Sequence, residues 1–149
     1  MVIAADTSFL FSLYGNDEHT SSAIRLLRAR NHALSLTTLN EFELANALRF
    51  SEFKSFLPSG SAAAYWDNFL EDKRQERVIT LQCNLSEILE EAMQLSGRWT
   101  LKNGHRSFDI LHVASGVLIQ ATHFLTFDKN QARLARKAGM QVPLLKGEA

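Results

Sequence analysis

The sequence has very little cysteine, since Cys83 is the only one in 149 residues. A single cysteine excludes a disulfide within the chain and a zinc site built from several thiolates. Long hydrophobic runs are also missing: nowhere do about eighteen uncharged apolar residues follow one another, so we expect no membrane-spanning helix. Residues 1–6 carry no charged leader and too few apolar residues for a signal peptide, and we therefore expect a cytoplasmic protein.

The chain has no excess of charge of either sign, because sixteen lysines and arginines balance sixteen aspartates and glutamates. A protein that grips long nucleic acid through many phosphates is normally basic. The balance therefore argues against a DNA-coating role, but it is compatible with an enzyme that gathers several acids in its site. With 46% hydrophobic and 21% charged residues, the composition is typical of a globular domain with its own core.

Short apolar runs alternate with stretches of helical periodicity along the chain. Strands are expected at residues 2–5, 33–36, 78–81 and 123–127, with a short last one at 141–143. Helices are expected at about 20–30, 38–51, 61–76, 85–98, 108–121 and 130–138. No linker or repeat interrupts the pattern. We predict one α/β domain over residues 1–149, with a mainly parallel sheet of four to five strands covered on both faces.

Two of the predicted strands lead directly into a carboxylate. Val-Ile-Ala-Ala precedes Asp6, and Phe-Leu-Thr-Phe precedes Asp128. The carboxyl ends of parallel strands form one edge of a sheet, and open α/β sheets bind ligands at that edge, where the strand order switches. Either aspartate alone is equally well explained as the N-cap of the next helix. The two together favour a functional site.

A third acid, Asp109, begins a helix that is apolar nearly all round. Asp109, His112 and Gly116 share one face at spacings i, i+3 and i+7, and apolar side chains cover the rest. Compensation of the helix dipole contributes only about 0.3–1 kcal/mol, whereas burying a charge without a partner costs more. We therefore expect a functional partner for Asp109. His112 is either a polar neighbour of the site or a core histidine bonded to backbone.

The helix expected at residues 38–51 offers two glutamates, Glu41 and Glu43. They flank its apolar stripe from opposite sides, so periodicity does not decide between them, and we expect one to face solvent. Several carboxylates at one edge repel one another unless some are protonated or a divalent cation lies among them. Oxygen ligands favour Mg²⁺ or Mn²⁺, which activate water and stabilise charge developing on phosphorus. Phosphodiester hydrolysis is the expected chemistry.

Four short motifs follow one another along the chain. They are Ala-Asp6-Thr-Ser, Glu43-Leu-Ala-Asn46-Ala-Leu, Asp109-Ile-Leu-His112-Val-Ala, and Phe-Leu-Thr126-Phe-Asp128 with Gln131, Leu134-Ala135 and Ala138-Gly139 behind it. Each alone is weak, but in this order and spacing they resemble the PIN-domain family, and within it the VapC-like ribonuclease toxins of toxin–antitoxin pairs. The resemblance covers nearly the whole chain and implies a three-layer α/β/α sandwich.

The resemblance also implies roles for particular residues. The catalytic acids that hold one or two Mg²⁺ or Mn²⁺ ions would be Asp6, Glu43, Asp109 and Asp128, which selects Glu43 over Glu41. The polar residues around them would be Thr7, Ser8, Asn46 and Thr126. An RNA substrate, a cognate antitoxin protein and a homodimer are expected on the same ground.

Two further segments are expected near functional surfaces. Arg106 ends a polar, glycine-containing loop, Lys102 to Arg106, that opens the helix carrying Asp109, and we expect this loop to contact substrate phosphates. The stretch from Ser51 to Gly60 carries three apolar side chains that look exposed: Phe53, Phe56 and Leu57. Such a patch is either a partner surface or ordinary packing against the next helix.

Two other functions remain open. A phosphotransfer domain can also begin with a strand that ends in an aspartate such as Asp6. However, the second aspartate that such hydrolases usually carry two residues on is replaced by Ser8, and residues 2–5 supply no acidic pair of the receiver type. A degenerate PIN-like module that only binds RNA or protein is the other alternative, and the presence of all four acids argues against it.

Overall fold

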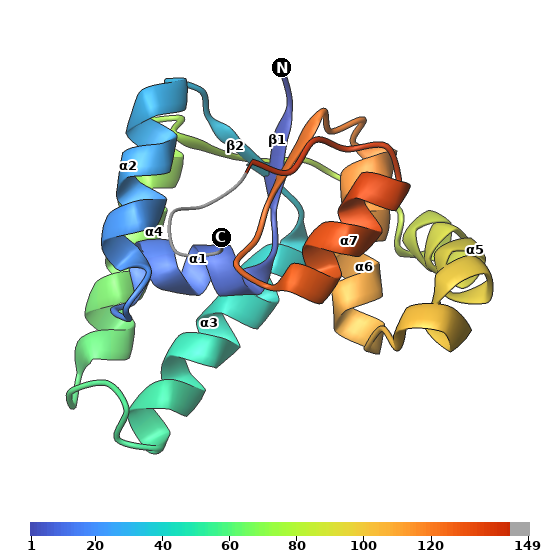
Figure 1. Ribbon diagram of the computed structural model, residues 1–149. Helices are drawn as coiled ribbons and strands as arrows, with labels where there is room; N and C mark the ends of the chain where they lie inside the picture. The colour runs from blue at the N-terminus through green and yellow to red at the C-terminus, as the bar shows by residue number, and fades with distance from the viewer. Residues whose placement is uncertain (144–149) are drawn as a thin grey trace.

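The computed structural model describes residues 1–143, which form seven helices and four strands (Figure 1). The strands are β1 (Ile3–Ala5), β2 (Leu34–Leu36), β3 (Val78–Thr80) and β4 (His123–Leu125). They lie in the order β3-β2-β1-β4, and each neighbouring pair is parallel. The strand expected at 141–143 is reduced to an isolated bridge between Gln141 and His123. The parallel sheet predicted from the sequence is thus confirmed.

Six helices match the predicted ones, and one is additional. The helices are α1 (Thr7–Tyr14), α2 (Thr20–Arg30), α3 (Thr38–Phe53), α4 (Ser61–Arg74), α5 (Leu85–Asn103), α6 (Ser107–Leu118) and α7 (Lys129–Lys137). Helix α5 continues past the predicted end at 98 and stops at Gly104, whose φ of +67° favours glycine. Lys102 therefore belongs to the last turn of a helix, and the loop expected at 102–106 is shorter than predicted.

Side chains of β1 alternate between two separate cores. Ile3 and Ala5 pack with apolar residues of α1, α2, α3 and α4, whereas Ala4 packs with those of α5, α6 and α7. Since successive residues of a strand point to opposite faces, helices cover the sheet on both sides, as predicted for a three-layer α/β/α sandwich. In residues 1–143 we find no helix with the length and apolarity to cross a membrane.

The chain connections place one particular pair of strand ends side by side. The path runs from β1 to β2 to β3 in one direction and then crosses over to set β4 against the other side of β1 (Figure 1). The strand order therefore switches between β1 and β4, which is where open α/β sheets bind ligands. The two strands stay paired beyond their ends, because the Asp6 amide donates to the Leu125 carbonyl over 3.1 Å.

Candidate acidic site

A pocket of about 370 Å³ opens at the carboxyl edge of the sheet, and all four predicted acids line it. Each acid comes from a different element: the end of β1, helix α3, the first turn of α6 and the loop after β4. The acids in that order are Asp6, Glu43, Asp109 and Asp128. The structure thus brings together residues that are far apart in the sequence.

Asp6 is the most buried of these acids, with a relative exposure of 3%. It caps α1 by accepting from the Phe9 amide over 2.9 Å, and it accepts from the hydroxyls of Ser8 over 2.8 Å and Thr126 over 2.5 Å. Burial raises its pKa from 3.8 to about 6, and the three hydrogen bonds limit the rise. Asp6 therefore caps a helix and also lines the pocket, so its capping role does not exclude a place in the site.

The two hydroxyls beside that carboxylate connect it to the next acid. Ser8 Oγ accepts from the Phe127 amide over 3.2 Å, and Thr126 Oγ1 accepts from the Asp128 amide over 3.0 Å. Asp128 in turn caps α7 by accepting from the Gln131 amide over 2.9 Å. Neither hydroxyl is free to rotate without losing a bond, and together they hold the two strand ends at a fixed separation.

Glu43 is held by a chain of side-chain hydrogen bonds that starts in the core. The Thr37 amide donates to Asn40 Oδ1 over 3.0 Å, so Asn40 Nδ2 faces the Ala5 carbonyl at 3.0 Å and His112 Nδ1 at 3.2 Å. Because Nδ1 accepts this bond, the ring proton lies on Nε2. Nε2 then donates to Glu43 Oε2 over 2.7 Å. His112 is therefore a polar neighbour of Glu43, rather than of Asp109 or of backbone.

The environment keeps Glu43 ionised. Burial acts to raise the pKa of this half-buried carboxyl, but the hydrogen bond from His112, with smaller contributions from Thr7 and Arg106, outweighs it and holds the pKa below its ordinary value. The Thr7 hydroxyl also lies 3.2 Å from His112 Nε2. Glu43 thus faces the pocket as a carboxylate with a fixed orientation.

The other glutamate of α3 lies outside this pocket. Glu41 is paired with Lys73 of α4, with 2.6 Å between Oε1 and Nζ. The structure therefore places Glu43 at the pocket and Glu41 outside it. The expectation that one of the two faces solvent is not met, because both are partly buried. Only Glu43 is placed to act with the three aspartates.

Asp109 has a protein partner that the sequence analysis did not identify. Arg106, three residues earlier, donates from Nε to Asp109 Oδ2 over 3.0 Å. The Asp109 side chain is 25% exposed and that of Arg106 is 81% exposed. The expected burial of Asp109 in the apolar helix is only partial, because the residue lies at the pocket wall, and a partner within the chain is present in the exposed guanidinium of Arg106.

Two predicted residues lie elsewhere, and two others were missed. Asn46 is exposed on α3 and does not line the pocket, and Lys102 is exposed on α5 with its Nζ 5.5 Å from the ring of Trp99. The asparagine that contacts the site is Asn40, for which the capping-box spacing after Thr37 was an available signal. Gln131 also lines the pocket, and its Nε2 donates to the Asp109 carbonyl over 3.2 Å.

The PIN domain family model matches residues 3–137, which is most of the chain and includes all four acids. The chain belongs to the PIN domain family. A comparison with curated proteins finds no sequence relative.

Solved structures share the fold of this PIN domain at low sequence identity. VapBC2 from Rickettsia felis, bound to a DNA fragment from their promoter, is 14% identical with a TM-score of 0.69, over 97% of this chain and 99% of that one. VapC20 of Mycobacterium tuberculosis, a Sarcin-Ricin loop cleaving toxin, is 17% identical with a TM-score of 0.65, over 88% and 93%. FitAcB from Neisseria gonorrhoeae is 14% identical with a TM-score of 0.55, over 95% and 96%.

The acids of this PIN domain suit a divalent cation in their chemistry but are not gathered around one point. All four offer carboxylate oxygens, the donors that Mg²⁺ and Mn²⁺ prefer. Among the residues that the structure describes, however, no three acidic, histidine or cysteine side chains stand close enough to hold a metal ion as they are. Asp6 is engaged by two hydroxyls and Asp109 by Arg106. Arg106 thus occupies one of the two carboxylate oxygens that Asp109 could offer to a cation.

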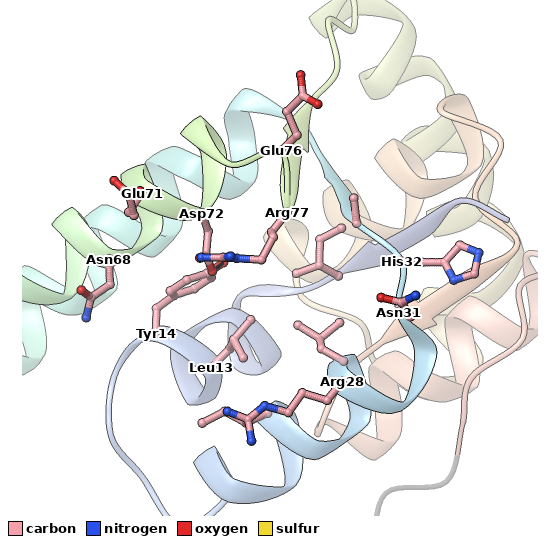
Figure 2. Close-up of a pocket in the computed structure, with 14 residues that line it drawn as sticks. Leu13, Tyr14, Arg28, Asn31, His32, Asn68, Glu71, Asp72, Glu76 and Arg77 are labelled. Carbon is pink, nitrogen blue, oxygen red and sulfur yellow. Dashed lines mark hydrogen bonds and ion pairs between the residues drawn. The ribbon is translucent and has the colours of Figure 1, made fainter.

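A larger pocket, of about 800 Å³, lies at the opposite edge of the sheet, where α1, α2 and α4 face the amino ends of β2 and β3 (Figure 2). Three of its polar side chains bond to one another. Tyr14 Oη donates to Asp72 Oδ2 over 2.7 Å, and Arg77 Nε donates to Asp72 Oδ1 over 2.9 Å. None of the four acids lines it. Its larger volume therefore does not make it the better candidate for the site of this PIN domain.

Proposed function

We propose that this PIN domain is a metal-dependent endoribonuclease and the toxin of a toxin–antitoxin pair. The observation that carries the proposal is the convergence of four carboxylates on one pocket at the switch point of the sheet: Asp6, Glu43, Asp109 and Asp128. The shared fold of a Sarcin-Ricin loop cleaving toxin supports RNA as the substrate.

The four carboxylates are proposed to hold Mg²⁺ or Mn²⁺. When bound, such a cation stabilises charge on the phosphate and makes water more acidic. The protein's own contribution is orientation. The hydroxyls of Ser8 and Thr126 fix the Asp6 carboxylate, and His112 keeps Glu43 ionised and directed into the pocket, where we assign it the role of orienting the attacking water.

The central test compares RNA cleavage by the wild-type protein with cleavage by acid variants. We expect Asp109→Asn and Glu43→Gln to lower the cleavage rate by about a hundredfold or more, because each removes one charge from the cation site. Glu41→Gln is the matched control, since it removes the same charge from the same helix but outside the pocket. The measurement is the appearance of new RNA 5′ ends in Mg²⁺ or Mn²⁺, with a chelator as the blank.

Equal cleavage by the wild type and Asp109→Asn would refute the mechanism. A wild type that binds Mn²⁺ in a titration but cuts no RNA would limit the protein to binding. A wild type that does neither would support the degenerate-module alternative, for which the Arg106–Asp109 ion pair is the favouring observation. Phosphotransfer through Asp6 is disfavoured by the burial of that carboxylate; a stable aspartyl-phosphate after acyl-phosphate labelling would revive it.

Arg106 is proposed to exchange Asp109 for a substrate phosphate. The guanidinium is exposed, borders the pocket and is already near the site where the phosphate must lie. We expect Arg106→Ala to tighten Mn²⁺ binding, since Asp109 loses its competing partner, and to weaken RNA binding while reducing the slope of its salt dependence by about one. Lys102→Ala, which removes a charge outside the pocket, should change neither. If both affinities stay unchanged in Arg106→Ala, the exchange does not occur.

An antitoxin and a second copy of the chain are the proposed protein partners. The structures that share the fold include VapBC2 and FitAcB. Phe53 and Phe56 are exposed, as expected of a partner surface, whereas Leu57 is buried and is removed from that prediction. Light scattering of the purified chain, alone and mixed with a candidate antitoxin, tests both partners: a chain that stays monomeric and unbound counts against them.

A further inference from the structure

Three rings from different segments form a stack beside the acidic pocket. The buried Phe9 ring of α1 lies 5.6 Å from the Phe127 ring with 18° between their planes, and Phe127 lies 4.4 Å from the imidazole of His19 with 13° between the planes. His19 precedes α2, and Phe127 follows β4. The stack therefore starts in the core and ends at the surface on His19.

The outer ring of this stack is open to a ligand. The His19 side chain is 40% exposed, and its contact with Glu18 is made by Nε2 at the ring edge, 3.4 Å from Oε1. Because Phe127 covers one face of the imidazole, the exposed area belongs to the other face and the edge. A planar ring with one face packed on Phe127 and the other face exposed provides a stacking surface.

The position of the ring relates it to the acids. His19 and Phe127 both line the pocket that contains the four carboxylates, and Phe127 stands directly between Thr126 and Asp128 in the chain. In single-stranded RNA the bases are free to stack on aromatic side chains, histidine included. A phosphodiester that reaches the acids therefore brings a neighbouring base within range of this surface.

We propose that the open face of His19 stacks on a nucleobase of single-stranded RNA next to the phosphodiester that is cut. The proposal rests on the nuclease function proposed above. It assigns His19 as a substrate-binding residue and Phe127 as its support. Stacking reads the flat face of any base, so this contact strengthens binding without selecting a sequence.

The test measures RNA binding without cleavage, in the Asp109→Asn background. The probes are a short fluorescein-labelled single-stranded RNA of mixed sequence and the same backbone with abasic spacers throughout. We expect His19→Ala to weaken binding of the complete RNA by roughly five- to a hundredfold, to leave the abasic affinity unchanged, and His19→Phe to bind like the parent. His32→Ala is the control, because it removes an exposed histidine at the far end of α2 that lies outside the pocket.

The possible outcomes distinguish base stacking on His19 from the proposed nuclease function. If His19→Ala weakens both probes equally, or if His19→Phe is as weak as His19→Ala, the base does not stack on this ring. Unchanged affinity in His19→Ala overturns the proposal as well. A wild-type chain that produces no new RNA 5′ ends in Mg²⁺ or Mn²⁺ counts against the proposed function itself, whereas normal cutting with unaffected His19 variants counts against the stacking alone.

Discussion

Replacing Asp6 with asparagine should make the protein more stable at neutral pH and at the same time nearly abolish RNA cleavage. The carboxylate is buried, and its pKa is raised from 3.8 to about 6. Such a rise corresponds to about 3 kcal/mol of destabilisation when the group is charged. Asparagine keeps an oxygen for the Phe9 amide and Ser8, and its Nδ2 can donate to Thr126 Oγ1. We expect the free energy of unfolding at pH 7 to rise by about 1–3 kcal/mol and cleavage to fall about a hundredfold or more.

The pH dependence of stability shows whether the charge of Asp6 stabilises or destabilises the fold. Since the raised pKa means that the folded state binds its proton more tightly than the unfolded state, the contribution of Asp6 to stability is full below about pH 4 and is lost as the pH rises through about 6. The wild type should therefore lose stability relative to Asp6→Asn across this window. Urea unfolding of both proteins at several pH values, without divalent cations, measures the difference.

Asp128→Asn is the matched control for this prediction. Asp128 also ends a strand, caps a helix and lines the pocket, but it is only partly buried, and asparagine caps a helix as well as aspartate does. This variant should lose activity without gaining stability. If Asp6→Asn shows no gain over wild type at pH 7, or if the gain is the same at pH 4, the charge of Asp6 is not the source of the strain.

Replacing His112 with alanine should lower RNA cleavage by roughly ten- to a hundredfold, the usual effect of removing a residue that orients a metal ligand. The imidazole is buried between Asn40 and Glu43, and its loss removes one hydrogen bond from each of them. A lost hydrogen bond costs about 0.5–1.5 kcal/mol, so stability should fall too. A structural role alone would also produce that fall, and the conservative variants are therefore decisive.

Glutamine and asparagine separate positioning from packing at residue 112. The Nε2 of a glutamine there falls near the imidazole Nε2 and reaches Glu43, whereas the shorter asparagine amide falls near Nδ1 and does not. We expect His112→Gln to recover most of the cleavage rate and His112→Asn to recover little. His105→Ala, at another buried histidine outside the pocket, controls for lost packing. Equal rates in the glutamine and asparagine variants would show that His112 does not act through Glu43.

Sequence periodicity was sufficient to predict the layers, the parallel sheet and three of the four acids that line the pocket. Asp6 and Asp128 follow buried strands, and parallel strands can place their ends only at a common edge. Helix α1 escaped prediction because Thr7–Tyr14 is short and mostly apolar, without a polar face to reveal its period. In the structure α1 packs against both α2 and α3, and this packing buries the apolar side chains that the sequence pattern left unassigned.

Long-range side-chain partners were beyond the reach of the sequence. Glu41 and Glu43 have the same chemistry, and only the approach of Lys73 from α4 and His112 from α6 separates their roles. Asn46 matched the family motif but is exposed, whereas Asn40, the capping-box residue, makes the contacts with Ala5 and His112. The ion pair between Arg106 and Asp109 depends on the rotamers of the two side chains, which no rule of sequence spacing specifies.

The hydrogen bond from Thr126 to Asp6 joins residues 120 positions apart in the chain. Contacts of such long separation form late, and a protein under synthesis presents its first strand to solvent long before its last strand exists. The side of the pocket that follows β4 does not exist until β4 has been synthesised and has paired with β1. An unfinished copy on the ribosome that still lacks β4 therefore has no complete acidic pocket, because Asp128 and the Thr126 hydroxyl are not yet in place.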